Sequence, residues 1–135
     1  MTTLALIGTG VVGERIINQA LKLGTYDIVG IFDENTARME ELAATYNLPT
    51  AASLEALLDL TPDWVYIGTP PVSHAPLTEK IAARGLHVLS EKPLAHDASD
   101  GEKMVAAVQA AGVKSAMNFP LMYGAAVQKL RDILE

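Results

Sequence analysis

Short apolar runs alternate with longer segments of helical spacing along most of this chain. The runs cover residues 4–7, 28–32, 64–67, 86–89 and 113–119, and they are rich in branched and aromatic side chains. They are too short for helices, and the first four show little polar alternation, which is typical of strands buried on both faces of a parallel sheet. A further short strand is predicted near residues 50–52.

The segments between these runs repeat apolar residues every three or four positions, which predicts amphipathic helices. The first stripe consists of Val12, Ile16, Ala20 and Leu23. Further stripes fall within residues 39–46, 54–58, 77–81 and 104–111. Side chains suited to N-caps and glycines in stop positions indicate where some helices begin and end. These residues are Ser53, Asp97, Gly85 and Gly112.

Alternating strands and helices require crossover connections, so the predicted sheet is parallel and has helices on both faces. We therefore expect an α/β fold with a doubly wound, mostly parallel sheet, and 135 residues suffice for a single domain. The final segment carries another apolar stripe, from Ala126 to Leu134. It is either a terminal helix docked on the sheet or a connector to a further domain, and spacing alone leaves both open.

Composition and charge exclude several classes of protein. Half of the residues are apolar and 19% are charged, as in globular proteins, while 10 basic and 16 acidic residues give a net charge of −6. We therefore expect no nucleic-acid partner, which needs a basic patch, and no membrane partner, which needs a cationic helix face. No apolar run reaches the roughly 18 residues of a membrane span, and the N-terminus lacks the basic start of a signal peptide. The absence of cysteine excludes disulfides and thiol chemistry, and it is compatible with the cytoplasmic location that we expect.

A glycine-rich segment lies between the first predicted strand and the first predicted helix. It fits the pattern G-x-G-x-x-G of dinucleotide-binding turns and consists of Gly8, Thr9, Gly10, Val11, Val12 and Gly13. In this pattern the first glycine permits a tight turn, the second lets a pyrophosphate approach the backbone, and the third allows close packing of the helix. The helix N-terminus then offers free amides to the phosphates. A turn without a ligand is the alternative, which the flanking strand and helix make less favourable.

Asp33 lies twenty residues after Gly13, at the end of the second predicted strand. A carboxylate here is expected to accept hydrogen bonds from both hydroxyls of the adenosine ribose, and it would repel the 2′-phosphate of NADP. Arg38 could accommodate that phosphate, although it also fits a solvated charge on a helix face, and Asp33 could be a helix cap. We therefore predict NAD as the preferred cofactor, with NADP as the alternative.

Two further loops follow predicted strands, with the sequences GTPPVSH at residues 68–74 and SEKPL at residues 90–94. Together with GTGVVG, Asp33 and the segment GLHVLSEKPLA, these loops resemble the Gfo/Idh/MocA oxidoreductases. The resemblance covers nearly the whole chain but only the amino-terminal domain of the family, whose members carry a second domain for the substrate. It implies an NAD(P)-binding domain at residues 1–120 and the start of a connector helix at residues 121–135.

The resemblance also implies roles for individual loop residues. Lys92 would be catalytic, because its ammonium would donate to a substrate oxygen while hydride is transferred. Glu91 would line the nicotinamide end of the site together with Lys92. Without the family resemblance, an ion pair between these two residues at the surface is the simpler interpretation. The Lys92–Pro93 peptide bond could be cis. The remaining cofactor contacts implied by the family fall on Thr69, Pro70, His74 and Asn118.

The chain departs from the family pattern after Asn118, where no basic residue follows before Gln128. Any contact made by that basic residue in other members is therefore in doubt. From its residue type alone, His74 is expected to be a capping or packing group. We expect His87 to be structural and His96 to be exposed. The three histidines lack metal-ligand spacing, so no metal is predicted.

These observations predict the nucleotide-binding domain of an NAD(P)-dependent dehydrogenase. Its substrate would be a sugar, a polyol or a related hydroxyl compound, and the 135-residue chain alone is expected to be inactive. A non-catalytic dinucleotide sensor and an S-adenosylmethionine-binding protein are the alternatives, and Lys92 argues against the first of them. The apolar stripe within residues 126–134 could also pair two copies of the chain into a homo-oligomer.

Overall fold

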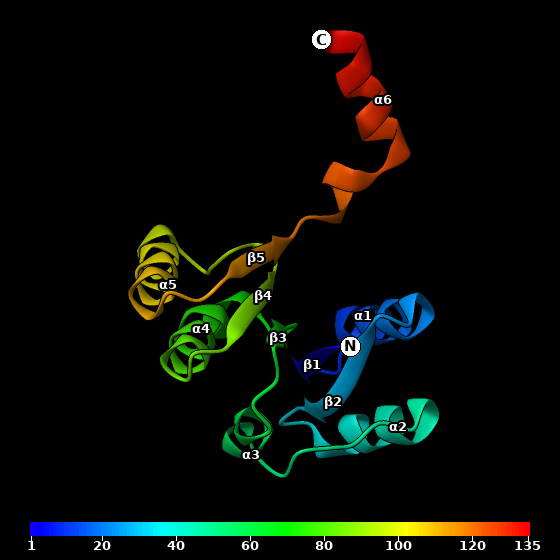
Figure 1. The fold of residues 1–135 in the computed structure, drawn as a ribbon, viewed down its shortest axis with the longest axis vertical. Helices are drawn as coiled ribbons and strands as arrows, with labels where there is room; N and C mark the ends of the chain where they lie inside the picture. The colour runs from blue at the N-terminus through cyan, green and yellow to red at the C-terminus, as the bar shows by residue number, and fades with distance from the viewer.

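A computed structural model describes residues 1–135 and contains a parallel five-stranded sheet between two layers of helices (Figure 1). The strands are β1 (Thr2–Ile7), β2 (Tyr26–Phe32), β3 (Trp64–Ile67), β4 (His87–Glu91) and β5 (Ser115–Asn118). Their order across the sheet is β2-β1-β3-β4-β5, and each neighbouring pair is parallel. The predicted fold class and all five main strands are thus confirmed. The additional strand near residues 50–52 is reduced to a single bridge between Thr50 and Ile31.

Six α-helices and two short 3₁₀ segments connect or follow these strands. The α-helices are α1 (Val11–Leu23), α2 (Thr36–Tyr46), α3 (Leu54–Asp59), α4 (His74–Ala83), α5 (Ala98–Ala111) and α6 (Ala125–Leu134). The 3₁₀ segments are η1 (Pro71–Ser73) and η2 (Pro120–Tyr123). Helices α1 and α2 lie on one side of the sheet, and α3, α4 and α5 lie on the other (Figure 1). None of the six is both long enough and apolar enough to span a bilayer.

The predicted helix boundaries have the expected chemistry. The Ser53 side chain accepts a 3.0 Å hydrogen bond from the amide of Ala56, and it thereby caps α3. Asp97 caps α5 in the same way, through a 2.9 Å bond from the amide of Asp100. Gly112 ends α5 with a φ of 65°, a conformation that favours glycine.

Each face of the sheet buries its own apolar cluster. Under α1 and α2 the cluster includes Leu6, Ile17, Ile31, Leu42 and Tyr66. On the opposite face, under α3 and α4, the cluster includes Ile7, Leu57, Val65, Ile67 and Ile81. The two clusters hold the strand ends in place, so the loops at the carboxyl edge of the sheet have a rigid support.

The predicted apolar stripe of α1 is partly wrong. The buried residues of this helix are Gly13, Ile17 and Ala20, whereas Val12 is 37% exposed and Leu23 is 64% exposed. Gly13 determines this rotation, because a Cβ at this position would overlap the carbonyl oxygen of Gly8. The helix therefore turns the side that carries Gly13 toward the sheet.

Helix α6 stands away from the sheet and from the other α-helices (Figure 1). None of its residues is buried, and Leu130, Ile133 and Leu134 are at least half exposed. The helix is therefore not docked on the sheet. The interpretation of the final apolar stripe as a docked terminal helix is wrong.

Candidate cofactor-binding site

The glycine-rich turn joins β1 to α1 at the carboxyl edge of the sheet. Gly8 has a φ of +97°, and a Cβ there would lie 2.8 Å from the backbone of Gly68, which follows β3. Gly10 differs from Gly8, because nothing lies within 4 Å of the position that its Cβ would take. Packing therefore requires Gly8 and Gly13, while Gly10 keeps a stretch of backbone open toward solvent.

The first turn of α1 begins at this open backbone. Gly10 is the N-cap residue and supplies no side chain to the free amides of the first turn. The side chains of Val11 and Val12 are 73% and 37% exposed and do not cover the turn. The amides and the partial positive charge of the helix end can therefore act on an anion that approaches Gly10.

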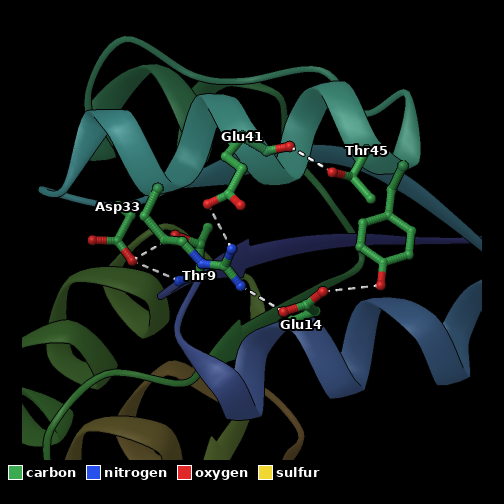
Figure 2. Close-up of polar contacts among 7 residues, drawn as sticks. Thr9, Glu14, Asp33, Glu41 and Thr45 are labelled. Atoms are coloured by element: carbon green, nitrogen blue, oxygen red, sulfur yellow. Dashed lines mark hydrogen bonds and ion pairs between the residues drawn. The ribbon is translucent and has the colours of Figure 1, made fainter.

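Asp33 is bound directly to the glycine-rich turn (Figure 2). Its Oδ2 accepts hydrogen bonds from the amide of Thr9 at 2.6 Å and from the Thr9 hydroxyl at 2.8 Å. Its Oδ1 accepts a 2.8 Å bond from the amide of Asn35, next to the start of α2. Burial alone would raise the pKa of Asp33, but these three hydrogen bonds outweigh it and lower the pKa below its ordinary value. The carboxylate is thus held in its charged form.

An open hollow of about 990 Å³ lies at this edge of the sheet. It brings together five of the residues predicted to bind the cofactor, namely Gly8, Gly10, Asp33, Thr69 and Pro70. Thr9 lies beneath it, fully buried, and Gly13 is buried in α1. The hollow is also bordered by residues that the sequence analysis missed, because no motif marks them: Ser53, Leu54, Glu55, Leu77 and Lys80. Arg38, His74, Glu91, Lys92 and Asn118 do not line it.

His74 is fully buried at the start of α4 and lies between two loops. Its Nε2 lies 2.8 Å from the carbonyl oxygen of Thr69, in the loop after β3. Its Nδ1 lies 3.1 Å from the carbonyl oxygens of both Pro93 and Leu94, in the loop after β4. The imidazole therefore joins the loop that borders the hollow to the loop that carries Lys92.

Glu91 is a buried carboxylate at the end of β4, and it is 6% exposed. Its Oε1 accepts a 2.9 Å bond from the Tyr66 hydroxyl and a 2.5 Å bond from the Asn118 side-chain amide. Asn118 is the register partner of Glu91 on β5, so the carboxylate ties together the ends of three adjacent strands. Burial, and then the Glu91 carboxylate, raise the pKa of Tyr66 above its ordinary value. The Tyr66 hydroxyl thus stays a donor.

Lys92 follows Glu91 and is exposed. Its backbone amide donates to Glu91 Oε2 at 3.2 Å, but its ammonium takes part in no ion pair or hydrogen bond within the chain. A surface pair between Lys92 and Glu91 is therefore absent. The Lys92–Pro93 peptide bond is cis, as the sequence analysis expected.

The other two histidines differ in their surroundings. The His87 ring packs edge-to-face on Trp64 with 5.1 Å between centroids, and its Nδ1 accepts a 3.2 Å bond from the amide of Lys114. His96 is exposed. No group of three histidine, aspartate or glutamate side chains is arranged to hold a metal ion.

Comparison with known proteins places this site in a family context. Residues 2–119 match the Gfo/Idh/MocA family, described as an oxidoreductase family with an NAD-binding Rossmann fold. The chain is 30% identical over 115 residues to scyllo-inositol 2-dehydrogenase (NADP(+)) of Bacillus subtilis. It is 36% identical over 110 residues to D-xylose 1-dehydrogenase (NADP(+)) 2 of Haloferax volcanii.

A solved structure has the same fold over almost the whole chain. The WlbA dehydrogenase from Bordetella pertussis, in complex with NADH and UDP-GlcNAcA, superposes on 98% of the chain with a TM-score of 0.93 and 27% identity. The chain spans only 41% of that protein. It likewise spans 35% and 34% of the Bacillus and Haloferax enzymes, while the matches cover 84% and 80% of the chain.

Proposed function

Because the chain belongs to the Gfo/Idh/MocA family of oxidoreductases with an NAD-binding Rossmann fold, we propose that residues 1–120 are the cofactor-binding domain of an NAD(P)-dependent dehydrogenase. The observation that carries this proposal is the hollow in which the open backbone of Gly10 and the charged Asp33 lie together. A sugar, a polyol or a related hydroxyl compound is the proposed substrate. The names of the inositol and xylose dehydrogenases support this class.

The pyrophosphate would rest against the turn at Gly10, where the absence of a Cβ leaves room for it. The amides of Val11, Val12 and Gly13 begin α1 and would donate to its oxygens. The backbone of Gly8 and Thr9 shapes the turn from below. Phosphate binding is thus assigned to main-chain groups, which bind the anion whatever nucleoside it carries.

The adenosine ribose would lie at Asp33. Oδ2 of this carboxylate already accepts two hydrogen bonds from Thr9, whereas Oδ1 accepts one, from Asn35. A carboxylate oxygen has about two acceptor sites, so Oδ1 retains one for a ribose hydroxyl. A second hydroxyl would bind Oδ2 by displacing the Thr9 hydroxyl. Because the carboxylate is charged, it would accept such bonds strongly and repel a 2′-phosphate.

The nicotinamide end would lie toward the loops after β3 and β4. Bound NAD supplies a carbon that accepts or returns a hydride. Thr69 and Pro70 would contact the cofactor, and His74 would hold their loop against the loop after β4. The free ammonium of Lys92 would donate to the substrate oxygen, which orients the substrate and stabilises charge on that oxygen.

Glu91 and Asn118 would act from beneath this end of the site. The Glu91 carboxylate is bonded to Tyr66, Asn118 and the amide of Lys92, so it would fix the strand ends from which Lys92 projects. The Lys92 ammonium has no partner within the chain, so it is available to donate to a substrate. No observation favours the alternative of a non-catalytic sensor.

We further propose that residues 121–135 begin a connector to a substrate-binding domain. Helix α6 is exposed along its whole length, and none of its apolar residues is buried in this chain. Residues 1–135 alone would then bind the cofactor but oxidise no polyol.

Calorimetric titration of the chain with NADH, NADPH and S-adenosylmethionine tests the cofactor assignment. We expect NADH to bind most tightly and S-adenosylmethionine not to bind; absence of binding by either dinucleotide would refute the proposal. The catalytic assignment needs residues 1–135 joined to a substrate domain of the family. There Lys92→Ala should abolish turnover but preserve the NADH affinity, and undiminished turnover would refute the role of Lys92.

A further inference from the structure

Arg38 is held by two carboxylates between α1 and α2, outside the hollow. Its guanidinium donates to Glu41 on the same helix at 2.7 Å and to Glu14 on α1 at 2.5 Å (Figure 2). The Arg38 and Glu14 side chains are only 30% and 36% exposed. These two pairs engage both terminal nitrogens of the only cationic side chain on α2, and Arg38 does not line the hollow.

Glu14 is itself fixed by a second contact. Its Oε1 accepts a 3.1 Å hydrogen bond from the Tyr46 hydroxyl, near the end of α2, while its Oε2 faces Arg38. Each oxygen of the carboxylate is therefore engaged by a different residue of α2. Isolated surface ion pairs contribute little to stability, but a carboxylate bound at both oxygens defines where the guanidinium lies.

The position of this network relates it to the ribose end of the site. Arg38 lies in the first turn of α2, five residues after Asp33, and its amide donates to the Asn35 side chain. Glu14 lies in the first turn of α1, directly after the glycine-rich turn that binds Asp33 through Thr9. The network thus links the first turn of α1 to the first turn of α2. Because two carboxylates, Glu14 and Glu41, pair with one guanidinium, the net charge of this network stays negative.

We propose that Glu14 and Glu41 determine cofactor selectivity by holding Arg38 away from the ribose, so that no cation is free to bind a 2′-phosphate. The inference rests on the proposed dinucleotide binding and adds to it the residues that select NAD over NADP. An arginine near the ribose is the usual acceptor of the 2′-phosphate in this fold. Here that arginine is present but is neutralised and turned aside by its carboxylate partners.

The affinities of NADH and NADPH for the 135-residue chain test the proposal by calorimetry. The variants are Glu14→Gln and Glu41→Gln, each with Arg38 intact and with Arg38→Ala. Asp59→Asn is the matched control, because Asp59 also pairs with an arginine, Arg84, but on α3. Thermal unfolding of each variant verifies that it is folded.

For the wild-type chain we expect NADH to bind at least about tenfold more tightly than NADPH. Glu14→Gln should bring the two affinities about fivefold to tenfold closer, because it raises the affinity for NADPH. A change of this size is expected for one charge-assisted contact to a phosphate. Asp59→Asn should leave the ratio unchanged, and Arg38→Ala should cancel the gain.

Two outcomes would overturn the inference while the proposed function stands. One is an NADH-to-NADPH ratio that does not respond to Glu14→Gln or Glu41→Gln although NADH still binds. The other is a gain in NADPH affinity in the Glu14 or Glu41 variant that is equally large with and without Arg38. The gain would then come from the loss of a negative charge and not from the release of Arg38. Lack of binding of both dinucleotides by the wild-type chain would instead refute the proposed function, and this inference with it.

Discussion

Thr9 donates from both its backbone amide and its hydroxyl to a single oxygen of Asp33, at 2.6 and 2.8 Å. This pair joins the turn after β1 to the end of β2, across the hydrogen-bonded strand pair that begins the fold. Thr9 is fully buried, so the carboxylate is held from beneath and Oδ1 is directed elsewhere, toward Asn35. The geometry of the turn and the position of the charged carboxylate proposed to bind the ribose are therefore fixed together.

Asp33→Asn should destabilise the chain at neutral pH and have little effect in acid. The folded-state pKa of Asp33 lies below its ordinary value of 3.8, so ionised Asp33 stabilises the fold above that value, and this contribution is lost as the pH falls through the lower folded-state pKa. We expect a loss of about 1 kcal/mol at pH 7, because solvent screens a half-exposed carboxylate.

Thermal unfolding of wild type and Asp33→Asn between pH 2 and pH 8 measures this difference. Asp27→Asn is the control, because Asp27 lies on β2, the strand that Asp33 follows, but is exposed and accepts no side-chain hydrogen bond in the structure. A stability difference between wild type and Asp33→Asn that persists unchanged at the acid end would contradict the account.

His74→Leu should destabilise the chain by about 1–3 kcal/mol, because it removes the polar contacts of a fully buried imidazole with the loops after β3 and β4. It should also weaken NADH binding, since the loop of Thr69 would no longer be held against the loop after β4. Urea unfolding and calorimetry measure the two effects. Unaltered stability together with unaltered NADH affinity would show that His74 does not join the loops.

Thr78→Val, one helical turn after His74 on α4, should have the opposite effect. The Thr78 hydroxyl is buried and has no hydrogen-bond partner, so valine of similar shape removes an unsatisfied group. We expect a gain of about 1 kcal/mol in the free energy of unfolding, with NADH affinity unchanged. A clear loss of stability in urea would indicate that the hydroxyl is satisfied in solution.

Much of the fold is predictable from local pattern. The strand Trp64–Ile67 follows from a continuous apolar run, because a strand buried on both faces needs no polar alternation. The N-caps at Ser53 and Asp97 follow from residue type and position. The stripe predicted for α1 is right at Ala20 but wrong at Val12 and Leu23, because apolar spacing does not reveal that Gly13 must face the turn.

The site is less predictable, because its side chains meet only through tertiary structure. The glycines and Asp33 form a motif with fixed spacing, so sequence alone finds them. The bond between Tyr66 and Glu91 depends on β3 lying beside β4, and the bond between Asn118 and Glu91 depends on the register of β4 and β5. Likewise, nothing in the sequence pairs Arg38 with Glu14, which is 24 positions away.

The central claim is that a dinucleotide lies against the bare backbone at Gly10, and Gly10→Ala tests it most directly. An alanine Cβ meets no atom of the folded chain there, and the φ of −66° is ordinary for alanine, so stability should fall by no more than about 1 kcal/mol. Gly101→Ala on α5 is the control, since its Cβ would meet only ordinary contacts, the nearest at 3.6 Å, away from the hollow. Calorimetry should show NADH affinity reduced at least about tenfold in Gly10→Ala and preserved in Gly101→Ala. A folded Gly10→Ala chain that binds NADH as tightly as wild type would contradict the account.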